Sequence, residues 1–456
     1  LMEEDVKRMA DLGLKAYRFS ICWPRVLPDG TLKGGVNRVG IGFYERLCKS
    51  LLNNGIEPVA TLYHWDLPSQ LELRGGWLSR DIVGHFADYA NLCFRYLGKY
   101  VRRWVTINEP WTQCVLGYAF GIHAPGKRKF PGTEPYLAAH HMLLAHAEAV
   151  RVFRESGAGA EVVEGAPGEI ALALNTEWYE PMDPSDAADK ASQSHMFAFN
   201  LGWFADPVYL GDYPEEMRNI CGERLPEFSG EERELLKGSC DFFGLNTYSA
   251  RYVGQASFAR QLAAFPGAVL GGRYITEQVH RLFRQPDPSF PPPAPDSPSY
   301  SADSGAGGIM TSVDPRDELS AMGWPVAPWG LGKLLCRVQE RYQPKAGIHI
   351  LENGIALDAN VSEERRTAFL QSNTAAIHNA MEQGADVRGY FVWTLMDNFE
   401  WALGTSKKFG LWEVDFATKE RRERPCCDFY RGLCQENAMD FADDEYRRIL
   451  RRPYAA

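Results

Sequence analysis

The chain has 456 residues, of which 45% are hydrophobic, and a formal net charge of -10. This length is above the usual size of one domain, but α/β barrels with loop insertions reach it. The negative charge argues against a nucleic-acid partner, and no apolar run is long enough to cross a membrane.

Ten cysteines are scattered along the chain, and none forms a C-x-x-C pair. Their apolar neighbours predict reduced thiols in the core, which favours a reducing, cytoplasmic compartment. Composition does not decide between a monomer and a homo-oligomer. Neither a metal-binding spacing nor a dinucleotide-binding loop is found, so no cofactor is expected.

Helical and strand patterns alternate along the chain. Apolar residues three and four apart predict helices, and short β-branched or aromatic runs predict strands. The predicted helices cover residues 3–13, 39–54, 80–98, 135–156, 184–200, 329–342 and 362–383. The predicted strands begin near residues 16, 57, 102, 169, 241, 347 and 387. This alternation is typical of a (β/α)8 TIM barrel, and residues 1–456 are expected to form a single domain.

Two stretches are predicted to be irregular. Residues 285–308 are rich in Pro, Ser and Gly and are expected to form a loop over the barrel face that carries the active site. Trp23-Pro24-Arg25 is expected to be a loop after the first predicted strand.

Two predicted strands end on a carboxylate. The apolar run at 104–107 stops at Asn108-Glu109-Pro110, because proline lacks the N–H that a strand ladder requires. A second run at 347–351 ends at Glu352. The carboxyl ends of parallel barrel strands share one mouth, so these two carboxylates are expected to meet there. Paired carboxylates flanking a bond are the minimal apparatus for glycoside hydrolysis.

Motifs along nearly the whole chain resemble glycoside hydrolase family 1, the β-glucosidase family. Their number and their order make the resemblance specific. The motifs are Arg18-Phe19-Ser20, Trp23-Pro24-Arg25, His64-Trp65-Asp66-Leu67-Pro68, Thr106 to Pro110, Phe199 to Pro214, Gly323-Trp324-Pro325, Leu351 to Gly354 and Trp393 to Gly410. The resemblance implies a retaining β-glycosidase that hydrolyses a small-molecule β-glycoside by double displacement.

The resemblance also implies a role for each matching residue. Glu352 matches the nucleophile and Glu109 the acid/base, and a retaining pair of this kind lies about 5–5.5 Å apart. Glu109 then needs a raised pKa, whereas Glu352 must stay ionised. The residues that match positions orienting the nucleophile are Arg18, Tyr248 and Asn246. The residues that match substrate-binding positions are His64, Asn108, Glu400, Trp401, Trp393 and Trp324.

Two positions narrow the substrate that the resemblance implies. A carboxylate at Glu400 would repel a phosphorylated sugar, so unphosphorylated β-D-glucosides are expected, with β-galactosides or β-fucosides as alternatives. Glutamate rather than glutamine at Glu109 argues against the thioglucosidase branch. The family's N-terminal glutamine, which binds the sugar, has no counterpart in this sequence.

Only seven strands are predicted, whereas a closed barrel of this type has eight. Because the sequence begins in a helix, we expect the missing strand to be the first of the eight. Three explanations stay open: an incomplete record of a longer protein, a gap closed by rearrangement or by a partner chain, and a relative that lost catalysis and binds a glycan or a protein. The third would tend to lose one of the carboxylates, and both are present.

Overall fold

A computed structural model describes residues 1–157, 166–255, 309–314, 316–358 and 361–438. The irregular stretch predicted at 285–308 lies outside the described residues. Within the described part of the chain, no helix is long and apolar enough to span a membrane.

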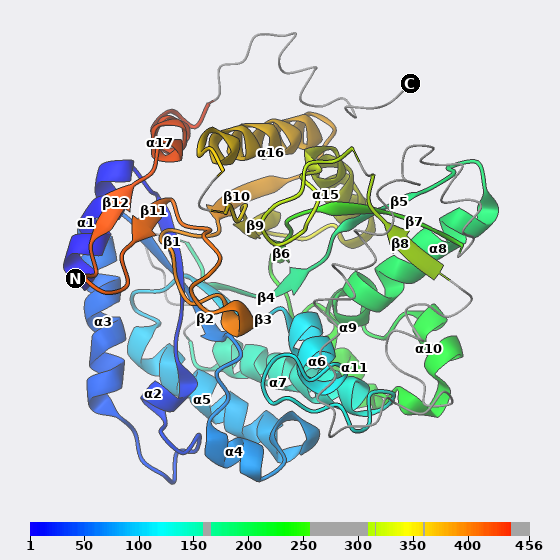
Figure 1. The fold of residues 1–456 in the computed structure, drawn as a ribbon. Coiled ribbons are helices and arrows are strands. Elements are labelled where there is room, and N and C mark those ends of the chain that lie inside the picture. Colours follow the sequence, from blue (N-terminus) through cyan, green and yellow to red (C-terminus); the bar gives the residue numbers. More distant parts are fainter. Residues whose placement is uncertain (158–165, 256–308, 315, 359–360, 439–456) are drawn as a thin grey trace.

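Seven parallel strands form the central sheet, which curves into a barrel wall (Figure 1). In spatial order they are β1 (Ala16–Ser20), β2 (Glu57–Tyr63), β3 (Arg103–Asn108), β4 (Glu169–Asn175), β6 (Phe243–Asn246), β9 (Ile348–Asn353) and β10 (Val387–Val392). This order follows the chain, as successive right-handed βα units require. All seven predicted strands are confirmed.

Helices form a layer outside the sheet (Figure 1). Those that confirm a prediction are α1 (Met2–Leu12), α3 (Arg38–Asn53), α5 (Asp81–Leu97), α7 (Glu134–Glu155), α8 (Ala187–Phe197), α15 (Pro328–Tyr342) and α16 (Glu364–Glu382). After α8 the backbone forms a π-helical turn, η2 (Ala198–Gly202), and then α9 (Trp203–Leu210). A single π turn adds one residue and leaves little trace in the apolar spacing.

Local capping explains where the first helices begin and end. Gly13 adopts the left-handed conformation, with φ 86°, and its N–H bonds the Ala10 carbonyl, which closes α1. This conformation costs glycine little because it has no Cβ. The Asn37 side chain accepts hydrogen bonds from the backbone of Val39 and Gly40, and so starts α3.

The Trp23-Pro24-Arg25 stretch is a one-turn helix, α2 (Trp23–Val26), so the prediction of a loop there was wrong. Proline in the first turn is compatible with a helix start, because that N–H would be unpaired in any case. The elements that no sequence pattern had predicted are α9, named above, and α4 (Ser69–Leu73), η1 (Gly76–Leu78), α6 (Pro110–Tyr118), β5 (Trp178–Pro181), α10 (Glu215–Cys221), η3 (Gly222–Arg224), α11 (Gly230–Leu236), β7 (Ala250–Gln255), β8 (Ile309–Ser312), η5 (Trp401–Leu403), β11 (Trp412–Val414), β12 (Arg421–Glu423) and α17 (Cys426–Glu436).

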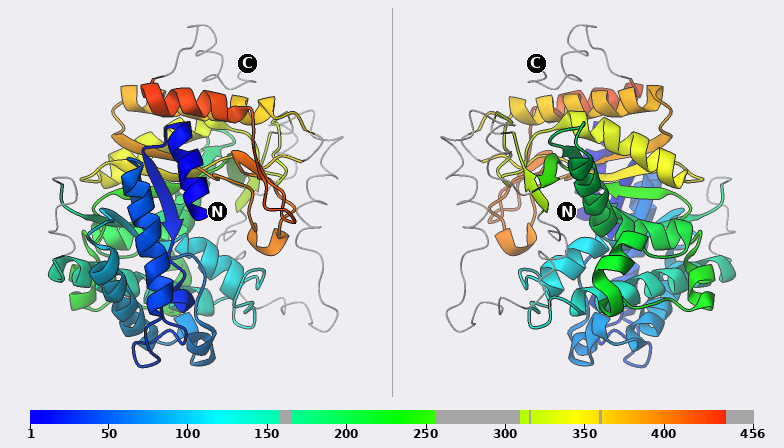
Figure 2. Two further views of the ribbon diagram at one scale, coloured as in Figure 1. Left: turned by 90° about the vertical axis from the view of Figure 1, so that its left-hand side faces the viewer. Right: turned by 90° about the vertical axis from the view of Figure 1, so that its right-hand side faces the viewer.

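The two ends of the described chain are packed together. Helix α17 lies beside α16 and near α1 (Figure 2). An apolar cluster of buried side chains joins the three helices, with Leu12, Phe369 and Tyr430 as members. Arg421 adds a two-pronged ion pair to Asp5 at 3.0 and 2.9 Å.

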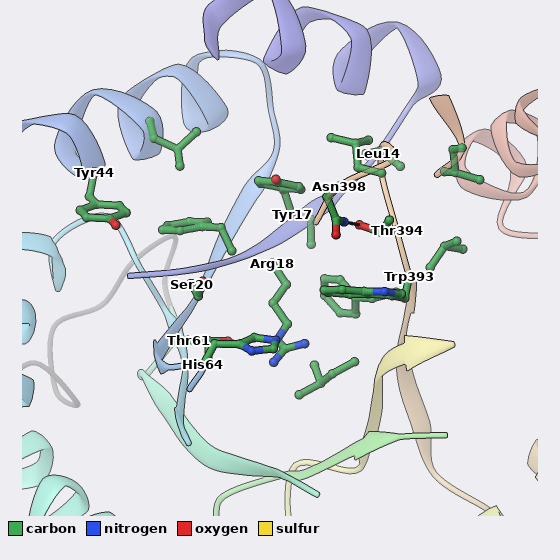
Figure 3. Close-up of a pocket in the computed structure, with 18 of the residues that line it drawn as sticks. Leu14, Tyr17, Arg18, Ser20, Tyr44, Thr61, His64, Trp393, Thr394 and Asn398 are labelled. Carbon is green, nitrogen blue, oxygen red and sulfur yellow. Dashed lines mark hydrogen bonds between the residues drawn. The ribbon is translucent and has the colours of Figure 1, made fainter. Parts of the chain in front are cut away.

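The barrel wall is open between β1 and β10. β1 pairs with β2 and β10 pairs with β9, and the described residues place no strand between them. A cavity of about 400 Å³ occupies the opening, with Arg18 of β1 and Trp393 beyond β10 facing each other across it (Figure 3). Direct pairing of the two strands, or another segment in the slot, is thus not observed in the described residues.

Gly354 offers a test of how closely the ends of β9 and β10 approach each other. A Cβ built on Gly354 would lie 1.9 Å from the carbonyl oxygen of Trp393. Gly354→Ala must therefore push the two segments apart, and we expect it to lower the free energy of unfolding by about 2 kcal/mol or more. Urea unfolding followed by circular dichroism measures this change.

Gly84→Ala is the matched control. Gly84 is exposed within α5, and a Cβ there meets no atom within 4 Å. This substitution should leave stability unchanged or raise it by up to about 1 kcal/mol, because alanine favours the helix. Wild-type stability of Gly354→Ala would contradict the close approach.

Candidate active site

A pocket of about 150 Å³ lies at the carboxyl ends of the barrel strands. The residues predicted for the site that line this pocket are His64, Asn108, Glu109, Tyr248, Trp324, Glu352, Trp393, Glu400 and Trp401. The other two, Arg18 and Asn246, hydrogen-bond to its carboxylates. The barrel therefore brings together all the residues that the sequence placed in one site.

Glu352 is the next-to-last residue of β9 and is held by two donors. Arg18 Nη1 donates to Oε1 at 2.6 Å, and the Tyr248 hydroxyl donates to Oε2 at 2.7 Å. The side chains of Arg18 and Glu352 are only 7% and 5% exposed. His64 Nε2 lies 3.7 Å from the same Oε1 atom. A buried carboxylate with these partners is both oriented and electrically compensated.

Glu109 follows β3 directly and is the N-cap residue of α6. Asn246 Nδ2 donates to its Oε1 at 2.9 Å, and the Thr112 hydroxyl donates to its Oε2 at 2.8 Å. Its backbone has φ 43°, a conformation that a residue with a Cβ rarely adopts. Pro110 then occupies the first turn of the helix, where proline fits best.

The two carboxylates have pKa values shifted in opposite directions. Burial, followed by the charge of Glu352, raises the pKa of Glu109 to about 7. Burial would also raise the pKa of Glu352, but the Arg18 charge and the adjacent His64 ring outweigh it and lower that pKa to about 2. Near neutral pH one group therefore carries a proton while the other is ionised.

Asn246 differs from its expected assignment as a partner of the nucleophile. Its Nδ2 donates to Glu109 and, at 3.2 Å, to Asn108 Oδ1, and neither bond involves Glu352. β6 pairs directly with β9, which carries Glu352, but the Asn246 side chain reaches across the mouth to Glu109, which follows β3. Of the three residues expected to orient the nucleophile, only Arg18 and Tyr248 hydrogen-bond to Glu352.

Three buried polar atoms of His64 and Asn108 have no hydrogen-bond partner among the described residues. They are Nδ1 and Nε2 of His64 and Nδ2 of Asn108, and Nδ1 of His123 is a fourth such atom in the pocket. The Asn108 Oδ1 atom accepts from Arg18 and Asn246, which leaves its amide N–H groups for something else. Buried polar atoms are normally paired, so these three indicate where a polar ligand binds.

Aromatic rings form the walls of the pocket. His64 and Trp401 stack with ring centroids 5.1 Å apart, and Trp65 packs on Trp401 at 4.4 Å. On another side, Trp324 lies 5.2 Å from Tyr248. Such rings offer flat apolar surfaces beside a few polar groups, which suits a ligand with both hydroxyls and C–H faces.

The histidines of α7 are buried and form hydrogen bonds within the protein core. His146 is buried and hydrogen-bonds Thr106 Oγ1 at 2.7 Å, while His140 pairs with the Tyr213 hydroxyl at 3.2 Å. Burial lowers the pKa of both rings, which keeps them neutral. In the described ranges, no group of His, Cys, Asp or Glu is placed to hold a metal ion.

Comparison with known proteins identifies the family. The model of Glycosyl hydrolase family 1 matches residues 1–439. The chain belongs to this family. It is a β-glucosidase-like glycoside hydrolase, and its nearly closed wall of parallel strands is a form of the (β/α)8 TIM barrel.

The relatives of this glycosyl hydrolase are β-glucosidases. Beta-glucosidase 4 of Oryza sativa subsp. japonica is 38% identical over 96% of this chain and 85% of its own length. Beta-glucosidase 42 of Arabidopsis thaliana is 39% identical over 91% of this chain and 78% of its own length. Raucaffricine-O-beta-D-glucosidase of Rauvolfia serpentina is 38% identical over 91% of this chain and 77% of its own length.

Solved structures of the family superpose on the same fold. A mutant of the rice Os3BGlu6 β-glucosidase, in a covalent complex with Glc, matches with a TM-score of 0.81 and 34% identity, over 95% of this chain and 87% of that one. The family 1 β-glucosidase of Thermotoga maritima matches with a TM-score of 0.79 and 35% identity, over 96% of this chain and 86% of that one.

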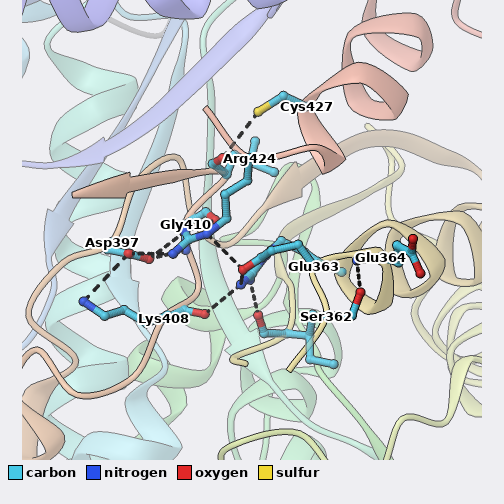
Figure 4. A network of polar contacts seen from close by, with 11 residues as sticks. Ser362, Glu363, Glu364, Asp397, Lys408, Gly410, Arg424 and Cys427 are labelled. Atoms are coloured by element: carbon cyan, nitrogen blue, oxygen red, sulfur yellow. Dashed lines mark hydrogen bonds and ion pairs between the residues drawn. The ribbon is translucent and has the colours of Figure 1, made fainter. Parts of the chain in front are cut away.

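A buried ion pair holds the loop that carries three of the predicted site residues (Figure 4). Trp393, Glu400 and Trp401 lie on the segment that follows β10, and Asp397 lies between them in the sequence. Asp397 accepts from Arg424 Nη1 and Nη2 at 3.0 and 2.9 Å and from the Gly410 N–H at 3.0 Å. Its side chain is 0% exposed, and Arg424 also donates to the Gly410 carbonyl, so the ion pair ties Asp397 to the backbone at Gly410.

Some pocket residues were missed from the sequence. Trp65 belongs to a motif that had been recognised, but no role was derived for it, and Thr112 lies two residues beyond the recognised stretch Thr106 to Pro110. Thr112 follows Glu109 by three residues, and a helix starting at Pro110 would have predicted the contact. His123 gave no signal, because it lies in a loop whose path depends on tertiary packing.

Arg424→Met tests the support of this loop. The substitution removes the guanidinium and leaves the buried Asp397 charge without its main partner, and Lys408 Nζ is 3.8 Å away. We expect the free energy of unfolding to fall by about 3–5 kcal/mol. Chemical denaturation measures it.

Arg422→Met provides the matched comparison. Arg422 pairs with Glu420 on the surface, where the two side chains are 60% and 57% exposed. Its loss should change stability by less than about 1 kcal/mol. Equal effects of the two substitutions would refute a special role for the buried pair.

Proposed function

We propose that this protein is a retaining β-glucosidase in which Glu352 is the nucleophile and Glu109 the acid/base. The observation that carries this proposal is the pair of carboxylates in one pocket with pKa values of about 2 and about 7. Such a pair presents an ionised attacking group and a proton donor at the same pH. Names of the relatives support glucose as the sugar that is released.

In the first step, the ionised Glu352 attacks the anomeric carbon while Glu109 gives its proton to the leaving oxygen. This forms a glycosyl ester on Glu352 and releases the leaving group as an alcohol. In the second step, Glu109, now ionised, removes a proton from water as the water attacks the same carbon. Glucose leaves with retained configuration, and both carboxylates return to their starting states. The mechanism requires the carboxyl groups to lie about 5–5.5 Å apart.

The first step removes the negative charge of Glu352, which changes its contacts with Arg18 and Tyr248. As Glu352 becomes an ester, it loses the charge that Arg18 compensates, and the Tyr248 hydroxyl stays near its oxygen. The loss of this charge also removes one cause of the raised pKa of Glu109. Its pKa should then fall, which suits its change from acid to base.

The sugar would be held by the unpaired polar atoms of the pocket. Asn108 Nδ2 can donate to the 2-hydroxyl, and His64, Glu400 and Trp401 can bind hydroxyls farther from the scissile bond. Trp393 would form the apolar floor, and Trp324 a platform for the leaving group. Burial, followed by the charge of Glu352, raises the pKa of Glu400 to about 7.

A carboxyl group at this position disfavours a phosphorylated sugar, because phosphate would face Glu400 and Glu352 in a buried site. We therefore propose unphosphorylated β-D-glucosides as substrates, with β-galactosides and β-fucosides as alternates. The proposed catalytic unit is one domain, since the pocket draws on strands from both ends of the described chain.

Glu352→Ala tests the role of the nucleophile. Without the attacking carboxylate, hydrolysis of 4-nitrophenyl β-D-glucoside should fall by at least about 10³-fold. Azide or formate can enter the space left by the side chain, and should restore part of the turnover with a product of opposite configuration. Product configuration by NMR distinguishes this outcome from residual wild-type enzyme.

The control for this experiment is Glu364→Ala, which removes an exposed glutamate of α16. It should retain wild-type turnover. If Glu352→Ala and wild type hydrolyse the glucoside equally, the assignment of Glu352 is wrong. If wild type shows no turnover at all, the proposed activity itself is refuted.

The pH dependence of kcat/KM tests the role of Glu109. The acid must be protonated in the free enzyme, so kcat/KM should fall above about pH 7, by about tenfold per pH unit. Glu352 stays ionised far below this range, so no acidic limb is expected between about pH 4 and pH 6. Initial rates at low substrate concentration give the profile.

Glu400→Gln separates the two groups that titrate near pH 7. If Glu109 sets the basic limb, the limb persists in Glu400→Gln, although the absolute rate is lower because a sugar contact is weakened. A limb that disappears in Glu400→Gln would assign the titration to Glu400 instead.

A further inference from the structure

Thr112 lies one helical turn beyond Glu109, and its hydroxyl faces the carboxyl group of that residue. Glu109 is the N-cap residue of α6 and Thr112 is the third residue of the helix, a spacing that brings two side chains together. The Thr112 hydroxyl donates to Glu109 Oε2 at 2.8 Å. Thr112 is 8% exposed and Glu109 9%, so bulk water competes little for this bond.

The backbone of α6 does not hold the Glu109 carboxyl group. The Glu109 carbonyl accepts from the Gln113 N–H at 3.1 Å, but its side chain forms no cap bond to the helix. Within the described residues, each carboxyl oxygen instead accepts one hydrogen bond from a side chain. Asn246 Nδ2 donates to Oε1 at 2.9 Å, and Thr112 donates to Oε2. These two bonds together fix the orientation of the carboxyl group.

Both bonds also favour the ionised form of Glu109. A donor binds a carboxylate more strongly than it binds an uncharged carboxyl group. Burial and the charge of Glu352 act in the opposite direction and raise the pKa of Glu109 to about 7, whereas the bonds from Asn246 and Thr112 lower it. Thr112 therefore offsets part of the effect of burial on this group.

Other ionisable groups surround Glu109 from several elements of the barrel. In the described structure they are Arg18 on β1, His64 beyond β2, His123 beyond α6, Tyr248 beyond β6, Glu352 on β9 and Glu400 beyond β10. No hydrogen bond from these groups to the Glu109 carboxyl oxygens is formed there. A substitution at Thr112 leaves all six in place, so a change in the titration of Glu109 can be assigned to the lost hydroxyl.

We propose that Thr112 is a positioning residue, whose hydroxyl stabilises the ionised form that Glu109 adopts between the two steps of the reaction. The inference rests on the proposed glucosidase function and deepens it, because it explains how one buried carboxyl group serves as acid and then as base at a single pH. In the first step Glu109 gives its proton to the leaving oxygen, and in the second it takes one from water. Thr112 keeps its own proton throughout and donates to Oε2 in the interval.

Thr112→Val tests this role in the first step. It removes the hydroxyl and keeps a β-branched side chain, so the ionised form of Glu109 loses a donor and its pKa should rise. With phenyl β-D-glucoside, kcat/KM requires the protonated acid. The basic limb of its pH profile should therefore move to higher pH by about one pH unit, the effect of one lost bond to a charged group.

A second substrate, 2,4-dinitrophenyl β-D-glucoside, tests the role in the second step. Its leaving group departs without a proton, so hydrolysis of the glycosyl ester is expected to limit kcat, and this step requires ionised Glu109. On the acidic limb of the kcat profile, Thr112→Val should lower the rate about tenfold, because the ionised fraction falls by that factor. Both limbs therefore move to higher pH, which a defect in packing alone does not produce.

Three further variants serve as controls. Thr112→Ser keeps the hydroxyl and should restore both limbs to their wild-type positions. Thr133→Val removes an exposed hydroxyl at the start of α7, outside the pocket, and should leave both profiles unchanged. If Thr112→Val does not fold, as judged by thermal melting, Thr112→Ala replaces it.

The possible results separate this inference from the function on which it rests. Wild-type limbs in Thr112→Val overturn the inference and leave the proposed function intact. A uniform loss of rate at every pH also overturns it, because it assigns Thr112 a purely structural role. Equal shifts in Thr112→Val and Thr112→Ser have the same consequence, since the hydroxyl is then not their cause. A wild type that hydrolyses neither substrate refutes the proposed function, and the inference with it.

Discussion

The contact between Arg18 and Glu352 is the interaction on which the active site depends. Burial alone would protonate Glu352, and an uncharged carboxyl group is a poor nucleophile. The guanidinium of Arg18, at 2.6 Å, reverses this effect and keeps the pKa of Glu352 at about 2. The charge retained on Glu352 then helps to raise the pKa of Glu109. One ion pair therefore contributes to both halves of the acid–base pair.

The same contact also spans the barrel. Arg18 lies on β1 and Glu352 on β9, and the opening of the wall lies between β1 and β10. Arg18 and Trp393 line the cavity in that opening (Figure 3), and Trp393 also lines the active-site pocket. The ion pair thus connects the first and the next-to-last strands of the sheet at the point where backbone pairing between its edges is absent from the described residues.

Backbone strain is concentrated at this site and is held by packing around it. Trp65, Glu109 and Trp401 have positive φ values of 74°, 43° and 43°, and all three line the pocket. Each such conformation costs about 1–3 kcal/mol, and it persists only where the surroundings fix it. The Asp397–Arg424 pair and the packed rings of His64, Trp65 and Trp401 supply that support.

The pattern of the chain was sufficient to predict the seven strands and the helices between them, because apolar periodicity is a local property. Short elements such as α2, α4 and β11 escaped prediction, since each has too few residues to show a period. At the site, the predicted residues came from the resemblance of the motifs to a family. The resemblance did not predict that Asn246 contacts Glu109 rather than Glu352. A strand position indicates that a side chain reaches the mouth, but its contact with Glu109 depends on how neighbouring strands are staggered.

The sequence by itself determined the alternation of strands and helices, the carboxylates at two strand ends and the family to which they belong. These follow from local spacing and from residue identity. Tertiary structure alone decided which of the two carboxylates is ionised, because burial, the Arg18 ion pair and the Asn246 and Thr112 contacts join residues far apart in the chain. It also decided the place of His123, since the loop that carries it is fixed by packing against α6 and Trp65 rather than by any pattern in its own residues.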